Sequence, residues 1–182
     1  MSVINVKNFH IAFITTDEEG KIIYGTPILI PNLMKVDVNP VFAEGKNYGD
    51  GVISQNEFKL QGANLAVELN RIPLNVVAEM FGRTIENGEM VISTNDKPNP
   101  FACGYEEELG NGDSELCWYY DCIANPPSKS SQQSTDNITF GSDTLTIAAK
   151  SREKDGKIAK IADTLSADFI SRETWFDAVE AA

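Results

Sequence analysis

The feature that most constrains the fold is the alternation of apolar and polar residues at 62–70, GANLAVELN. Successive side chains of a β-strand point to opposite faces, so this pattern gives a strand with one apolar row and one mostly polar row. The first row is Ala63, Leu65, Val67 and Leu69, and the second is Asn64, Ala66, Glu68 and Asn70. A strand with one dry face is typical of an antiparallel sheet.

A short helix is predicted directly after this strand. Pro73 suits the first turn of a helix, where a backbone N–H has no partner, and Gly82 suits the position after the last turn. The apolar residues that recur between them at helical spacing are Val76, Val77, Met80 and Phe81. We therefore expect a helix from Pro73 to Phe81 whose apolar face covers one end or side of the sheet.

The remaining chain reads mostly as strands joined by turns. The signals are a strand at 9–14, a turn at 15–21, a second strand at 22–31, an Asn87-Gly88 hairpin turn, two strands within 100–124, a bulge or short turn at 141–143 between short strands, and a hairpin tip at 151–157. The segment 171–182 can form a terminal helix anchored by Trp175, Phe176 and Val179.

These elements amount to about eight or nine strands, one central helix and one terminal helix. Such a count favours a mainly β protein, an antiparallel β-sandwich or barrel with a flanking α-helix. The length of 182 residues suits one domain, 1–182, better than two.

Two segments have the composition of loops. Residues 44–54 contain Gly45, Gly49 and Gly51 with Asn47 and Asp50, which all tolerate positive φ. A loop of this length is uncommon unless it has a role, so we expect a mobile contact arm. The polar stretch 125–137 is expected to be a second flexible loop.

The charge balance argues against a protein that grips nucleic acid. The chain has 15 basic and 27 acidic residues and a formal net charge of −12. Non-specific affinity for DNA comes from basic side chains that neutralise phosphates, so this chain should repel a phosphate backbone. Acidity that merely aids solubility is the simpler interpretation of the same number.

The cysteines and the single histidine do not suggest a metal site. Cys103, Cys117 and Cys122 lack zinc-ligand spacing, and His10 is distant in sequence. Simple alternation places Cys117 and Cys122 on opposite faces of one strand, so we expect free thiols and no cofactor. Without a long apolar run or a signal-peptide pattern, we expect a soluble, cytoplasmic protein.

No motif for nucleophilic catalysis, nucleotide binding or zinc hydrolysis occurs in the sequence. Three classes of function stay open: a structural protein, an acidic β-sandwich module that binds carbohydrate through Trp118 and Tyr119, and a hydrolase with an acidic pair. Core packing is the simpler role for Trp118 and Tyr120, because consecutive aromatic residues on a strand point to both faces. The acidic stretch 105–115 is read as a solvated turn.

The order of several motifs resembles the major tail proteins of long, non-contractile-tailed bacteriophages. An early YGTP at 24–27 follows the first hairpin, a strand leads into a helix that starts with Pro73 and Leu74 and ends at Gly82, and an R-x-x-D-G-K turn occupies 152–157. The similarity spans roughly residues 8 to 160 and lies in the ordered set of motifs.

This resemblance implies a tail tube subunit that assembles into hexameric rings stacked around a DNA channel. By analogy, the fold is shared with the tubes of contractile tails and of type VI secretion systems. Expected partners are further copies of the chain, a tape measure protein, and tail terminator and distal tail proteins. DNA would pass through the lumen without tight binding, no membrane would be involved, and the protein would be assembled in the host cytoplasm and located in the virion tail.

Three sets of residues are candidates for this role. Lumen-facing positions are expected at Glu57, Asn64, Glu68, Asn70 and Asp121, where carboxylates would repel phosphates. The inter-ring contact is expected at Glu44, Gly45, Lys46, Asn47, Tyr48, Gly49, Asp50 and Gly51. The helix residues Pro73, Leu74, Val76, Val77, Met80 and Phe81 are expected to lie at a subunit boundary.

Overall fold

The structure, a computed structural model, describes residues 2–16, 21–49, 52–131, 133, 141–169 and 172–180, with backbone alone at 48–49 and 52–55. The predicted turn residues 17–20, the end of the predicted loop at 134–137 and the strand residues Ile138 and Phe140 lie outside this part. Of the predicted loop 125–137, residues 128–130 are instead a short strand.

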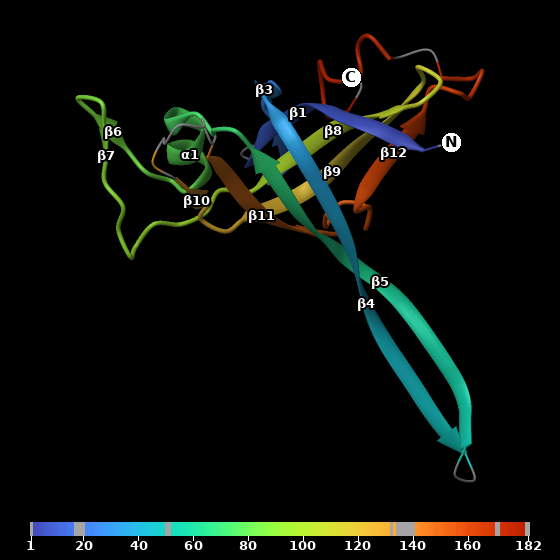
Figure 1. Cartoon of the computed structure of the whole chain (residues 1–182). Coiled ribbons are helices and arrows are strands. Elements are labelled where there is room, and N and C mark those ends of the chain that lie inside the picture. Colours follow the sequence, from blue (N-terminus) through green and yellow to red (C-terminus); the bar gives the residue numbers. More distant parts are fainter. Residues whose placement is uncertain are drawn as a thin grey trace.

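Within the described residues the chain forms twelve strands and one α-helix (Figure 1). In chain order they are β1 (Val3–Thr16), β2 (Ile22–Tyr24), β3 (Ile28–Ile30), β4 (Leu33–Gly49), β5 (Val52–Leu69), α1 (Leu74–Met80), β6 (Ile85–Glu86), β7 (Glu89–Met90), β8 (Phe101–Leu109), β9 (Ser114–Ala124), β10 (Ser128–Ser130), β11 (Ser142–Lys150) and β12 (Ala159–Asp163).

Ten of the strands form one antiparallel sheet. Its main order is β2-β1-β8-β9-β11-β5-β4, with β3 beside β1, β10 beside β11 and β12 beside β9. The strands β6 and β7 form a separate hairpin, in which the Asn87-Gly88 turn brings Glu86 opposite Glu89. The predicted mainly antiparallel β fold with a flanking helix is confirmed, although the described sheet does not close into a barrel.

The core lies under the alternating strand that the sequence predicts. Leu65, Val67 and Leu69 of β5 are fully buried, and the β11 residues Leu145 and Ile147 pack beside them. Burying a side chain of this size stabilises the fold by about 1.5–3 kcal/mol. The opposite face of β5 carries the exposed Asn64.

Helix α1 closes one end of this core. Val76, Val77, Met80 and Phe81 are all buried in the same cluster as β5. Pro73 precedes the first helical residue and accepts the N–H of Val77 at 3.1 Å, and Gly82 follows the helix at φ +62°. The predicted helix is confirmed, because its start and stop signals act locally.

The pairing of β8 with β9 differs from simple alternation. A register shift lies between Phe101 and Cys103, so that Cys103 pairs with Tyr119 whereas Phe101 pairs with Cys122. Because of this extra residue, Cys117 and Cys122 belong to the same core cluster. The prediction that they point to opposite faces is therefore wrong. All three cysteines are free and buried.

The segment 151–157 is not a hairpin tip. Strands β11 and β12 both pair with β9, at residues 121–124 and 115–119 respectively, and both run antiparallel to it. The chain therefore leaves β9 at the end of β11, turns through 151–157, and rejoins the same edge of β9.

The C-terminal residues 172–180, called the strap below, form turns and not the predicted helix. The predicted anchors do pack: Val179 is buried, and Trp175 and Phe176 lie against a second small cluster with Trp118 and Tyr120. The indole N–H of Trp118 donates to the carbonyl oxygen of Trp175 at 3.1 Å. A backbone carbonyl that a helix would use internally thus accepts a hydrogen bond from the sheet.

We predict that Gly104→Ala destabilises the fold. A Cβ at this position would lie 2.6 Å from the carbonyl oxygen of Cys117 and 2.7 Å from the Trp118 ring, so the β8–β9 pair would have to move. Overpacking of this kind costs about 1–3 kcal/mol of unfolding free energy. Urea denaturation followed by tryptophan fluorescence measures the loss.

The matched control is Gly45→Ala, since a Cβ on Gly45 meets nothing within 4 Å. Its unfolding free energy should stay within about 0.5 kcal/mol of the wild type. Equal losses in the two variants would contradict the close packing of Trp118 on Gly104.

Candidate functional site

A long two-stranded arm leaves the sheet. The ladder between β11 and β5 ends at Lys150 and Gly62, whereas β4 and β5 stay paired out to Gly49 and Val52. Figure 1 shows this outer part, residues 42–49 with 52–60, projecting well away from the other strands. The prediction of a mobile loop at 44–54 is wrong for the described residues, which are paired strands. Asp50 and Gly51 lie outside them.

One side of the arm carries an apolar stripe of Phe42, Phe58 and Leu60. Phe42 lies directly across from Leu60, and Phe58 is two residues further along the same strand face. The side chains are 55%, 65% and 48% exposed. Three large apolar residues therefore line up on a ribbon beside which the described part of the chain places no further strand.

A bulge creates this stripe. Val41 pairs with Gly62 and Phe42 with Leu60, which leaves Gln61 as an extra, unpaired residue in β5. One extra residue moves every following side chain of a strand to the other face. If Gln61 were instead paired with Phe42 in a regular ladder, Phe58 and Leu60 would lie on the side opposite Phe42.

The predicted lumen residues do not form one patch. Asn64 and Glu68 share the outer face of β5, and Asp121 of β9 lies on the same face of the sheet. Asn70 follows the end of β5, and Glu57 lies on the arm opposite Gly45, on the side away from the apolar stripe. The structure brings three of the five positions together.

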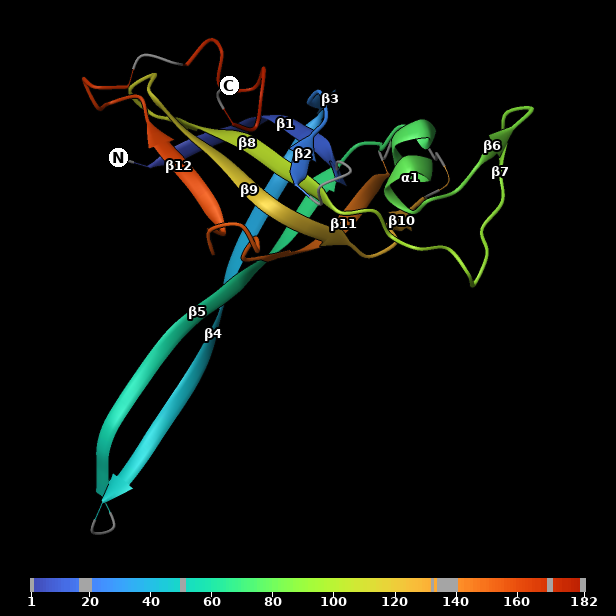
Figure 2. The same cartoon turned by 180° about the vertical axis from the view of Figure 1, so that it is seen from behind.

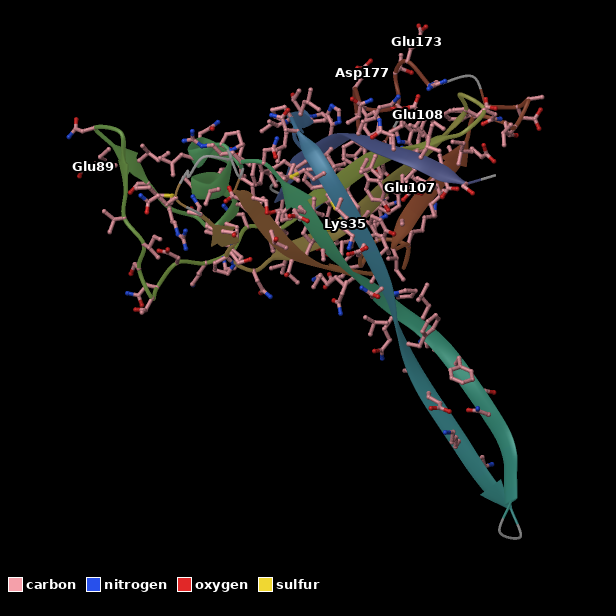
Figure 3. All side chains as sticks on the ribbon, viewed as in Figure 1. Lys35, Glu89, Glu107, Glu108, Glu173 and Asp177 are labelled. Atoms are coloured by element: carbon pink, nitrogen blue, oxygen red, sulfur yellow. The ribbon has the colours of Figure 1, made fainter. Side chains whose placement is uncertain are left out.

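This outer face is polar but nearly balanced in charge. The Lys150 ammonium lies 3.3 Å from a carboxylate oxygen of Asp121. Glu68 accepts a hydrogen bond from the Ser142 hydroxyl at 2.7 Å, and its cross-strand partner is Lys35, whose position Figure 3 shows on β4. The carboxylates of this face therefore have nearby cations.

A groove with an apolar floor lies beside α1. It has a volume of about 360 Å³. Its apolar lining is Ile72, Leu74, Val77, Met90, Ile92, Pro126 and Pro127, and its cations are Arg71, Arg83 and Lys129. Of the predicted boundary helix, Leu74 is 38% exposed and Pro73 is partly exposed, whereas the four apolar residues after them are buried within the chain. We call this the α1 groove.

The cations of the α1 groove differ in their partners. Arg83 donates from Nε to Asp96 at 2.5 Å. Among the residues that the structure describes, Arg71 and Lys129 make no ion pair. The groove therefore combines an apolar lining with two uncompensated positive charges.

An acidic row crosses the inner face of the sheet. Glu107 pairs with Glu115, and Glu115 pairs with Asp163 on the far side (Glu107 is labelled in Figure 3). Burial raises the pKa of the Glu107 carboxyl, and the charge of Glu115 raises it further. The sequence interpretation of a solvated turn missed this row, because its members lie in strands.

The residues of two resemblance motifs meet in one cluster. Arg152 donates to Asp155 from Nε at 2.6 Å and from Nη2 at 2.7 Å, and pairs with Glu180 of the strap at 2.6 Å. Its guanidinium lies 4.0 Å from the centre of the Tyr120 ring and 3.5 Å from the Tyr24 hydroxyl. Tyr24 begins the YGTP motif, so residues of two motifs that are distant in sequence meet beside the strap.

The geometry does not favour the other functional alternatives. Trp118 and Tyr119 are both buried, so the predicted carbohydrate platform is not presented to solvent. In the described part of the chain, no group of three or more His, Cys, Asp or Glu residues is arranged to hold a metal ion. The same residues contain no helix with the length and apolar character that a bilayer crossing requires.

We predict that Glu107→Gln stabilises the protein at neutral pH. The folded state raises the pKa of Glu107, so it favours the protonated form, and the ionised wild type carries a penalty. Removing one of two directly opposed like charges is worth roughly 0.2–1 kcal/mol. The advantage of the variant should shrink as the pH falls through the raised pKa of folded Glu107 and be gone below the ordinary value of 4.5, which thermal denaturation at several pH values will show.

Glu108→Gln is the control with the opposite sign. Hydrogen bonds from Asn5 and Lys7 lower the pKa of Glu108, so its charged form is favoured in the folded state. This variant should lose stability at neutral pH, and the loss should disappear as the pH falls through the lowered pKa. The same sign for both variants would contradict the assignment.

No protein-family model and no curated protein matches the sequence. Two solved structures are similar to the chain in shape. One is the anti-feeding prophage cap, described as the tube terminating cap, with 13% identity over 90% of this chain and 93% of that chain and a TM-score of 0.46. The other belongs to the sheath-tube complex of the PVC extracellular contractile injection system in its extended state, with 12% identity over 88% and 92% and a TM-score of 0.46.

Proposed function

We propose that the chain is a structural, non-enzymatic subunit of a phage-type tail tube. Copies of it polymerise as stacked hexameric rings around a channel that conducts DNA during ejection. The arm is the observation that carries this proposal, and the ordered motifs of the sequence support it.

The arm needs a partner from outside its own chain. An isolated two-stranded hairpin is at best marginally stable in water. This one also exposes Phe42, Phe58 and Leu60 on a single side. Exposed apolar patches and long unpaired strands promote association, and natural proteins keep them where association is their function. The arm is therefore a contact between copies, and in the tube it links one ring to the next.

The outer face with Asn64, Glu68 and Asp121 is the proposed wall of the channel. Phosphates bind where cations outnumber anions, and here the nearby cations Lys35 and Lys150 are matched by carboxylates. Such a wall offers DNA no net attraction, and the net charge of −12 opposes binding elsewhere. DNA then slides without tight binding.

The remaining expectations follow from this role. The chain acts as one domain in the virion tail after assembly in the host cytoplasm. Its partners besides its own copies are the tape measure, tail terminator and distal tail proteins. In this role Asn64, Glu68 and Asp121 belong to the channel wall, and residues 44–49 belong to the inter-ring contact.

We predict that the purified wild type forms rings and tubes and that Phe58→Asp stops tube growth. A carboxylate in the stripe would have to be buried without a partner when the arm docks, which costs several kcal/mol. Negative-stain electron microscopy reads out the tubes. Ala43→Asp, which adds the same charge on the other side of the arm, should leave tubes intact.

Exchanging two neighbouring residues, Phe58→Lys with Lys59→Phe, provides a second test with unchanged composition. The exchange moves the aromatic ring to the other side of the arm, where position 59 lies across from Ala43, so tubes should again be lost while the melting temperature of the subunit stays close to that of the wild type. A wild type that stays monomeric at every concentration would refute the proposed function.

We further predict that lysines at Asn64 and Glu68 slow DNA ejection. Asn64 is exposed and Glu68 is partly exposed, so lysines there, on the same face as Lys35 and Lys150, would create a cationic wall that binds phosphates. Tubes should still form, and ejection of labelled DNA from virions should slow more at low salt than at high salt. The double variant Asn64→Gln, Glu68→Gln is the matched control, and wild-type ejection rates in the lysine variant would remove the channel-wall assignment.

A further inference from the structure

We propose that the α1 groove of one copy receives the apolar stripe on the arm of a second copy. The inference rests on the proposed function, in which the arm is a contact between copies. It adds the receiving site on the neighbour and the chemistry by which the two surfaces recognise each other.

The α1 groove has the lining that an apolar side chain requires. Leu74 and Ile92 are 38% and 68% exposed at its surface, and the prolines at 126 and 127 form part of its wall. Its volume of about 360 Å³ falls within the range of sites that bury large groups. Bulky rings such as Phe58 and Phe42 are suitable occupants.

The arm carries a carboxylate that can meet the cations of the groove. Arg71 and Lys129 line the groove without an ion-pair partner among the described residues, in a chain whose net charge is −12. Glu44 lies directly across from Phe58, on the same side of the arm as the apolar stripe. Its present partner is the exposed Lys46 at 2.7 Å, and such a surface pair is worth only about 0–1 kcal/mol. Glu44 can therefore exchange this partner for a groove cation.

The placement of the two surfaces makes the contact intermolecular. Figures 1 and 2 show α1 on one side of the sheet and the arm projecting from the other, so a copy cannot place its own stripe in its own groove. Two different complementary surfaces on one subunit give a heterologous contact, which continues from copy to copy and builds rings or filaments. Each copy contributes one arm and one groove.

The decisive experiment uses one variant defective in each surface. Phe58→Asp disables the arm, and Leu74→Asp disables the groove without burying a new charge in the free subunit, since Leu74 is exposed and an acidic residue is favourable in the first turn of a helix. Each variant alone should form no tubes and remain as single rings or subunits. Negative-stain microscopy and analytical ultracentrifugation measure this.

An equal mixture of the two variants should form pairs. The intact arm of the Leu74→Asp protein can dock in the intact groove of the Phe58→Asp protein, whereas the other two surfaces are disabled, so the mass doubles and growth stops. Val91→Asp is the matched control, because Val91 is 73% exposed but does not line the groove. This control should form tubes as the wild type does.

A charge swap tests the same contact with substitutions on exposed positions. The double variant Arg71→Glu, Lys129→Glu should lose tubes, and adding Glu44→Lys should restore them in part.

Tubes from Leu74→Asp, or no pairing in the mixture, would overturn the groove assignment while leaving the tube proposal intact. Failure of the wild type to assemble would instead overturn the proposed function and with it this inference.

Discussion

The structure depends on strand β5, whose inner half has more strand partners than its outer half. Along its inner half β5 is paired on both sides, by β11 and by β4, and its apolar row is sealed against the core. Along its outer half β4 is its only partner among the described strands. The well-packed half fixes the direction in which the other half leaves the sheet, so the arm is held by the core although it contributes nothing to it. Both the stability of the subunit and its reach come from this continuity.

Local signals in the sequence were sufficient to predict the inner half of strand β5 and helix α1. The alternation at 62–70 and the Pro73 and Gly82 signals act over a few residues, and both predictions hold. The arm could not be predicted in the same way, because its glycines and asparagines have loop character and only the partner strand makes them extended. Pairing partners that are distant in sequence leave no local pattern.

Single-residue irregularities explain most of the other errors. The register shift between Phe101 and Cys103 places Cys117 and Cys122 in one cluster, and Gln61 aligns the apolar stripe. A prediction based on strict alternation of side chains assigns every residue after a bulge to the wrong face, because the alternation itself gives no sign of the extra residue. The α1 groove and the Arg152 cluster were missed for a different reason, since each combines segments that only the folded chain brings together.

The strap is synthesised after every strand that it covers. Until residues 172–180 arrive, Trp118 and Tyr120 form an open apolar surface in the middle of an otherwise complete sheet. Partly folded chains with such surfaces aggregate readily. Formation of the sheet alone therefore does not protect a new copy from aggregation. Protection begins when the strap has been translated and has packed over Trp118 and Tyr120.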